Sequence, residues 1–187
     1  MKIAIFGGSF DPVHIGHVHA VIEAKMALDL DKIIFIPAKQ APLKTTSPTE
    51  DSHRLKMLQL AVREYDFIEI DNFELGQDGV SYTYETAKYL TGKYPDDEIY
   101  FLMGMDQYNN FEKWNHKDEL LNMMKFAVMG RAAGDMNIEQ PFVPVHQPVV
   151  EVSSTTIRER VAKGDIVRHQ LNTAVYEYIK EQGLYEA

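Results

Sequence analysis

The chain has 187 residues, of which 45% are hydrophobic and 25% charged, and this predicts one globular domain over residues 1–187. The formal net charge of −9 disfavours a nucleic-acid partner, which would need a basic face, and the lack of cysteine excludes disulfides and thiolate-bound metals. No apolar run approaches the ~20 residues of a membrane span, and the N-terminus has the pattern of a core strand, so we expect a cytoplasmic protein without a membrane partner.

The first predicted element is a buried strand over residues 2–6, which is short, apolar and rich in β-branched residues. It ends at Gly7-Gly8, a pair that lets backbone N–H groups approach a ligand closely. A helix is predicted over residues 16–29, and His14 and His17 at its start are three apart, so their imidazoles share one face. Because a helix N-terminus favours negative charge, this stretch has the features of an anion-binding loop. A plain turn with a capped helix is the alternative interpretation.

The next predicted elements are a strand over residues 32–37, a loop from residue 38 to 48, a helix ending near residue 64 and a strand over residues 67–70. The loop follows the carboxyl end of a strand, which is where open α/β sheets bind ligands. Its Lys44 is either a phosphate ligand or a solvated lysine, and the pattern leaves both interpretations open.

A second strand that ends in glycine is predicted over residues 99–103, after a helix that ends near residue 91. Gly104 closes this strand, and Asp106 is placed to cap the helix that follows. Trp114, the only tryptophan, comes shortly afterwards. The pattern leaves it open between a core residue and a ligand contact.

The last third of the chain is predicted to contain strands over residues 126–129 and 149–152 and helices that end at Gly164 and near residue 182. Residues 131–148 hold three prolines and are predicted to form a loop without chemistry. Ser153 is a natural N-cap, and Ser154 and Arg158 share a helix face. This helix start is either a second anion-binding cradle or a plain capped helix.

The alternation of strands and helices predicts an α/β fold of Rossmann-like type, with a doubly wound, mainly parallel sheet and helices on both faces. The loops after the first, fourth and last strands then fall on the carboxyl edge of the sheet, where a switch point could bring them together. Anion-binding groups from opposite ends of the chain are therefore predicted to meet over one ligand.

The start of the chain resembles the GGxFDPxHxGH motif of the nucleotidylyltransferase superfamily, residue by residue from Gly7 to His17. Further matches to the bacterial nicotinate-nucleotide adenylyltransferases, including their SSTxIR element, lie at residues 54–57, 81–86, 102–114, 153–158 and 175–185. The resemblance implies adenylyl transfer from ATP to nicotinate mononucleotide in NAD biosynthesis, which gives nicotinate adenine dinucleotide and pyrophosphate.

The resemblance also implies roles for single residues. The catalytic, phosphate-binding group would comprise His14, His17, Lys44 and Arg158. ATP would further contact Gly7, Gly8, Ser9, Phe10, Gly104, Asp106, Ser153, Ser154 and Thr155. The pyridine ring would stack on Trp114, and the nicotinate nucleotide would also contact Tyr82, Thr83 and Asn115.

We expect Mg²⁺ to arrive with the triphosphate of ATP, so no protein metal ligands are assigned. The expected partners are ATP and nicotinate mononucleotide, and a homodimer stays open. Three alternatives remain at this point. They are a sister adenylyltransferase that uses nicotinamide mononucleotide or phosphopantetheine, a nucleotide-binding module without catalysis, and a zinc hydrolase built on His14, His17 and His19.

Overall fold

The structure is a computed structural model, described here at residues 1–39, 49–77, 83–131, 137–148 and 150–187. Within these ranges six strands form one sheet in the order β3-β2-β1-β4-β5-β6, and every neighbouring pair is parallel. The strands are β1 (Lys2–Gly8), β2 (Lys32–Pro37), β3 (Ile68–Ile70), β4 (Glu98–Gly104), β5 (Lys125–Arg131) and β6 (Val143–Gln147). This arrangement confirms the predicted doubly wound α/β fold.

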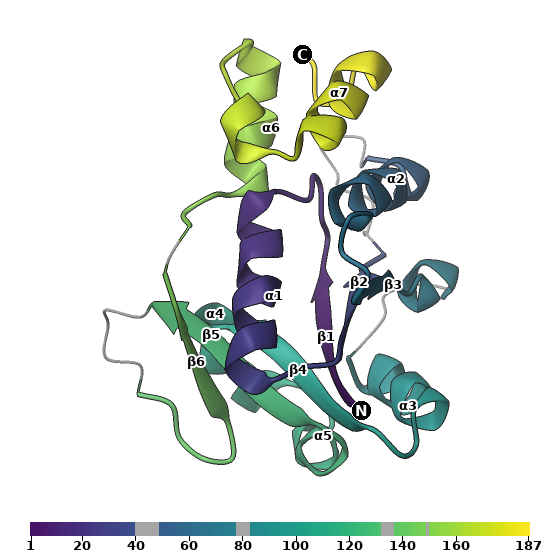
Figure 1. Cartoon of the computed structure of the whole chain (residues 1–187), viewed down its shortest axis with the longest axis vertical. Helices are drawn as coiled ribbons and strands as arrows, with labels where there is room; N and C mark the ends of the chain where they lie inside the picture. Colours follow the sequence, from purple (N-terminus) through teal and green to yellow (C-terminus); the bar gives the residue numbers. More distant parts are fainter. Residues whose placement is uncertain (40–48, 78–82, 132–136, 149) are drawn as a thin grey trace.

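Helices cover both faces of the sheet. In the described residues they are α1 (Ile15–Leu28), α2 (Asp51–Val62), α3 (Thr83–Lys93), α4 (Met105–Asn109), α5 (Lys117–Met123), α6 (Ser154–Lys163) and α7 (Thr173–Gln182). Figure 1 shows α1 crossing one face of the sheet, with α6 and α7 at the end of the molecule towards which β1 runs. No helix in these ranges is long and apolar enough to cross a bilayer.

Alternate side chains of each strand enter two separate cores, because successive residues of a strand point to opposite faces. Ala4 of β1 packs with residues of α1, α2, α6 and α7, whereas Ile3 and Ile5 pack with residues of α3 and α5. Both faces of the sheet are therefore buried, as a parallel sheet requires.

The chain order reverses between β1 and β4, since β2 and β3 lie on one side of β1 and β4 to β6 on the other. The loops that follow β1 and β4 therefore leave the sheet at neighbouring carboxyl ends. Such a switch point is where ligands bind in open α/β sheets.

The last strand does not lie where the sequence predicts it. Residues 150–152 form no strand, and β6 instead occupies part of the predicted loop over residues 131–148. Pro144 obscured this strand, because proline cannot donate to a ladder hydrogen bond. In the sheet order β6 is an edge strand that pairs with β5 alone, so proline is tolerated there.

Candidate active site

The site begins at the loop between β1 and α1, where His14 is the N-cap of α1. Its Nδ1 accepts the backbone N–H of Gly16 at 3.0 Å. The backbone N–H of His14 in turn donates to Nδ1 of His17 at 3.1 Å. These reciprocal bonds form a capping box, with histidines in the places more often taken by Ser or Thr and Glu or Gln. The start of the helix therefore fixes both imidazoles.

The same bonds determine which nitrogen carries the proton. Because each Nδ1 accepts a hydrogen bond, a neutral imidazole must hold its proton on Nε2. Burial lowers the pKa of His14 to about 4, and burial together with the neighbouring His14 lowers the pKa of His17 to about 3. The rings stack with centroids 3.7 Å apart. At neutral pH the pair therefore presents two uncharged Nε2–H donors.

Gly16 explains why a glycine separates the two histidines. A Cβ atom at this position would lie 2.9 Å from Cε1 and 3.0 Å from Nδ1 of His14. Real Cβ contacts are essentially never that short, so any other residue would displace the imidazole of His14. The glycine of the HxGH pattern thus protects the position of its first histidine.

The N-terminus of α6 packs directly against this loop. Ser153 caps α6 by accepting the N–H of Thr156, as predicted. The Ser154 hydroxyl donates to the carbonyl of Pro12 at 2.8 Å, and the Arg158 guanidinium donates to the carbonyl of Asp11 at 2.8 Å. These bonds join residues 142 and 147 positions apart in the sequence. The two predicted cradles therefore lie side by side.

The end of β4 supplies the third element of the predicted site. Gly104 is the N-cap of α4, so the prediction that Asp106 caps this helix is wrong. Asp106 is exposed and lies in the first turn, where the helix dipole favours a carboxylate. A Cβ at Gly104 would meet nothing within 4 Å, so the space beside this residue is open.

Trp114 lies half-buried at the core that contains Ile3 and Ile5, on the other face of the sheet from α1. Its ring packs against those of Phe111 and Phe101, with centroids 5.1 and 5.7 Å away. Trp114 is therefore a core residue over part of its side-chain surface, and the rest of that surface is accessible to solvent. The ring of His116 stacks on Tyr84 at 4.0 Å, which ties the Trp114 segment to the first turn of α3. Thr83 begins that helix, so the residues predicted for the nicotinate nucleotide come from two touching segments.

The other predicted residues differ in how they could act. Phe10 is only 2% exposed, and its ring packs in the core beside His17, so its side chain is not available to a ligand. Lys44 and Tyr82 lie outside the described residues. The structure adds two residues that sequence reasoning missed, Arg54 and Tyr185, which both bond to the loop after β1.

The predicted alternative of a zinc site on three histidines is not formed. The His19 ring lies 2.9 Å from the carbonyl of Pro148, while Nδ1 of His14 and of His17 is occupied by backbone N–H groups. In the part of the chain that the structure describes, no group of three or more His, Cys, Asp or Glu side chains could hold a metal ion.

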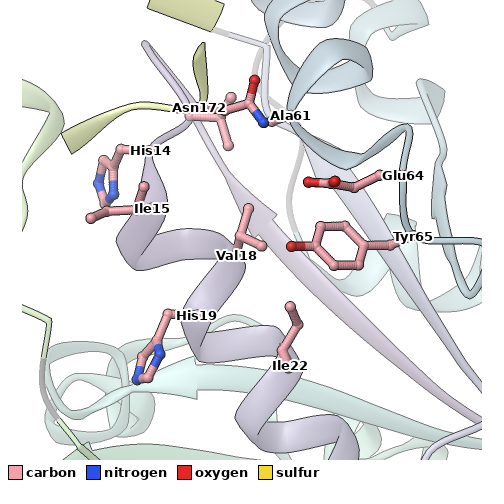
Figure 2. A pocket seen from close by; sticks show the side chains of 10 residues that line it. His14, Ile15, Val18, His19, Ile22, Ala61, Glu64, Tyr65 and Asn172 are labelled. Atoms are coloured by element: carbon pink, nitrogen blue, oxygen red, sulfur yellow. The ribbon is translucent and has the colours of Figure 1, made fainter. Parts of the chain in front are cut away.

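A cavity of about 270 Å³ lies on the outer flank of α1, between this helix and the end of α2 (Figure 2). Glu64 and Tyr65 point towards Val18 across it, and His14 lies at its rim. Its lining is mostly apolar and carries a carboxylate, which repels phosphate. The cavity is therefore a neighbour of the candidate site, and its lining does not suit a triphosphate.

Fold and site together define a class of protein. Two neutral imidazoles, an arginine and the N-termini of two helices gather at the carboxyl edge of a parallel sheet. Such an arrangement suits the phosphates of a nucleotide, which accept hydrogen bonds, and the chain has no cysteine to serve as a nucleophile.

Comparison with known proteins narrows this class. The family model described as cytidylyltransferase-like matches residues 5–160. A curated relative from Geobacillus thermodenitrificans, named probable nicotinate-nucleotide adenylyltransferase, is 40% identical over 187 residues, which cover 100% of this chain and 87% of the relative. The chain belongs to the nicotinate-nucleotide adenylyltransferases of the cytidylyltransferase-like family.

Solved structures agree on the fold. Plasmodium falciparum nicotinic acid mononucleotide adenylyltransferase complexed with NaAD matches with a TM-score of 0.80 at 21% identity, over 98% of this chain and 97% of that one. A putative nicotinate-nucleotide adenylyltransferase from Vibrio parahaemolyticus matches with a TM-score of 0.74 at 20% identity, over 98% and 94% of the two chains.

Proposed function

We propose that this chain transfers the AMP part of ATP to nicotinate mononucleotide, giving nicotinate adenine dinucleotide and pyrophosphate. The relative at 40% identity carries the name of that activity. The observation that carries the proposal is the meeting of His14 and His17 with Ser154 and Arg158, because they come from opposite ends of the chain and all suit phosphate.

The chemistry needs positioning more than proton transfer. A phosphate oxygen of nicotinate mononucleotide attacks the α-phosphorus of ATP in line, the bond from that phosphorus to the bridging oxygen breaks, and pyrophosphate leaves with the electron pair. The second pKa of a phosphate monoester is about 6, so the nucleophile is already largely dianionic and needs no general base. This fits a site without an obvious catalytic dyad.

Donors fixed before the substrate arrives would stabilise the negative charge of the transition state. They are the Nε2–H groups of His14 and His17, the Arg158 guanidinium and the backbone N–H groups of the first residues of α6. Lys44 stays a prediction as a further donor. Magnesium belongs to this reaction as part of the substrate, Mg·ATP, since it keeps most of its waters and needs few protein oxygens.

The acceptor would bind beside Trp114, whose accessible face can stack on the pyridine ring. Tyr82, Thr83 and Asn115 are the predicted neighbours of the nicotinate carboxylate. Backbone N–H donors at the start of α3 would pair with the oxygens of a carboxylate. An amide NH₂ is itself a donor, so these N–H groups would be left without an acceptor, at a cost of about 1–3 kcal/mol. We therefore propose a preference for the acid nucleotide over the amide.

Pyrophosphate release tests the proposal. The chain is mixed with Mg·ATP and, in turn, nicotinate mononucleotide, nicotinamide mononucleotide, phosphopantetheine or no acceptor. Fastest release with nicotinate mononucleotide supports the proposal, and faster release with another acceptor would assign a sister activity. Release with no acceptor at all would contradict it, while ATP binding without release would indicate a binding module. A cytoplasmic location and a homodimer stay predictions.

A further inference from the structure

The turn from Ser9 to Pro12 lies between β1 and the histidines, and side chains from distant parts of the chain hold it. Arg158 and Ser154 bond to the carbonyls of Asp11 and Pro12, as described above. Arg54 of α2 donates to the carbonyl of Ser9 at 2.7 Å, and the Tyr185 hydroxyl donates to the carboxylate of Asp11. The four bonds reach this turn from α2, α6 and the end of the chain.

Arg54 is an unusual residue for a protein core. It has 0% exposure, and its guanidinium pairs with the Asp51 carboxylate at 2.6 Å. Its Nε is buried and has no hydrogen-bond partner within the described residues. Burying a cation costs stability unless its partners compensate, so a buried arginine with an unsatisfied nitrogen calls for a role beyond packing.

The bond to Ser9 has a geometric consequence. The peptide group is planar and trans as a rule, so a carbonyl that points at Arg54 makes the next N–H, that of Phe10, point the opposite way. Phe10 also has a φ of 48°, in the left-handed region that bulky residues avoid. The turn thus has a conformation that its own residues disfavour, and outside contacts must maintain it.

Tyr185 acts on the same turn from the other end of the sequence. Burial and the hydrogen bond to Asp11 raise the pKa of its hydroxyl, so this hydroxyl stays protonated and donates. A hydrogen bond to a charged acceptor is stronger than one between neutral groups. The carboxylate of Asp11 is therefore fixed by the third-last residue of the chain.

We propose that Arg54 and Tyr185 are positioning residues for the triphosphate of ATP, which act by holding the Ser9–Pro12 turn in its place between β1 and the two histidines. The inference rests on the proposed function for the identity of the nucleotide. It assigns to this turn two supporting residues, and it places the buried positive charge of Arg54 directly against the turn.

The chain offers a matched pair of variants for the test. Tyr185→Phe removes the hydroxyl that holds Asp11. Tyr178→Phe removes a hydroxyl from α7 that bonds instead to Nδ1 of His53 at 2.7 Å. Each variant removes a hydroxyl from a partly buried hydrogen bond, so a purely structural role predicts a loss in melting temperature for both and no difference in ligand affinity.

Calorimetry measures the Kd of Mg·ATP and of Mg·pyrophosphate for each variant, without acceptor, and steady-state assays measure both KM values. For Tyr185→Phe we expect both dissociation constants to rise about tenfold, equivalent to about 1.4 kcal/mol, with the KM for nicotinate mononucleotide within about twofold of the wild type. Tyr178→Phe should bind ATP normally. Normal ATP binding by Tyr185→Phe, or equal weakening by Tyr178→Phe, would overturn the proposal.

Arg54 is tested by Arg54→Met and Arg54→Lys. We expect weaker ATP binding in the first and partial recovery in the second, which keeps the charge; wild-type binding by both would overturn its assignment. If Arg54→Met does not fold, Arg54→Lys and Tyr185→Phe decide. Because binding is measured without acceptor, these binding results do not depend on whether the chain catalyses adenylyl transfer.

The wild-type chain separates the two proposals. If it binds ATP and pyrophosphate but transfers no adenylyl group, only the proposed function is overturned. If it binds neither, both proposals are overturned.

Discussion

Replacing His17 separates its structural from its catalytic contribution. Its Nδ1 accepts the N–H of His14 at 3.1 Å, and its ring packs edge-on against Phe10 with centroids 5.0 Å apart. His17→Ala removes both contacts and the Nε2–H donor. His17→Asn keeps an acceptor near the position of Nδ1, since the asparagine side-chain oxygen reaches about as far, but it has no donor at the position of Nε2.

The two variants should therefore differ in stability and agree in activity. Loss of one preorganised donor lowers kcat by about 10²–10³, or about 2.7–4 kcal/mol, and we expect this for both. His17→Ala should also lose about 1–3 kcal/mol of unfolding free energy, because the buried N–H of His14 loses its partner. His17→Asn should lose less than half of that amount.

Pyrophosphate release at saturating ATP and nicotinate mononucleotide measures kcat, and urea unfolding measures the free energy. The folded fraction under assay conditions must be determined for each variant, so that a loss of folded protein is not counted as a loss of turnover. Folded His17→Asn with a kcat within threefold of the wild type would refute the assignment of His17 as a donor to the reacting phosphates.

Three further predictions follow from the same site. Gly16→Ala should lower kcat at least about tenfold, because the new Cβ displaces the His14 ring. Gly92→Ala, with nothing within 4 Å of its Cβ, is the control and should keep the wild-type kcat in the same pyrophosphate assay. The unfolding free energy should be constant above about pH 7 and should fall between pH 6.5 and about pH 3–4, because the unfolded chain binds protons that the buried His14 and His17 do not. The fall should reach at most about 1.4 kcal/mol per pH unit for each histidine. An unfolding free energy in urea that stays constant between pH 7 and 4 would contradict this. Trp114→Ala should raise the KM for nicotinate mononucleotide about 2–10-fold and leave the KM for ATP unchanged in steady-state assays.

The sequence predicted the parts of this molecule that follow from periodicity and topology. Alternating strands and helices allow few arrangements other than a parallel sheet, because crossover connections have one hand. In such a sheet the loops after the first and fourth strands lie at the same carboxyl edge, so their location can be predicted without knowing where the side chains lie. The i, i+3 spacing of His14 and His17 likewise predicts that their rings share one face of the helix, and in the structure the two rings stack.

The parts that the sequence did not predict depend on contacts between distant residues. Arg54 has the helical spacing of the buried residues Met57, Leu58 and Ala61, so its burial could have been inferred from its register. Its target, the Ser9 carbonyl, could not. The tautomers of the two histidines follow from backbone hydrogen bonds that no spacing rule specifies.

The distance along the chain between the two cradles explains why the site needs anchors. A turn between a strand and a helix has few contacts of its own, and the left-handed conformation of Phe10 makes this one intrinsically unfavourable. Bonds from Ser154 and Arg158, and from Arg54 and Tyr185, fix the turn before any ligand is present. Donors that are already ordered cost no reorganisation when charge develops on the phosphates, which is the condition for large electrostatic stabilisation of a transition state. The ordering is completed during folding, and for that reason residues far from the reacting atoms should affect the affinity for ATP.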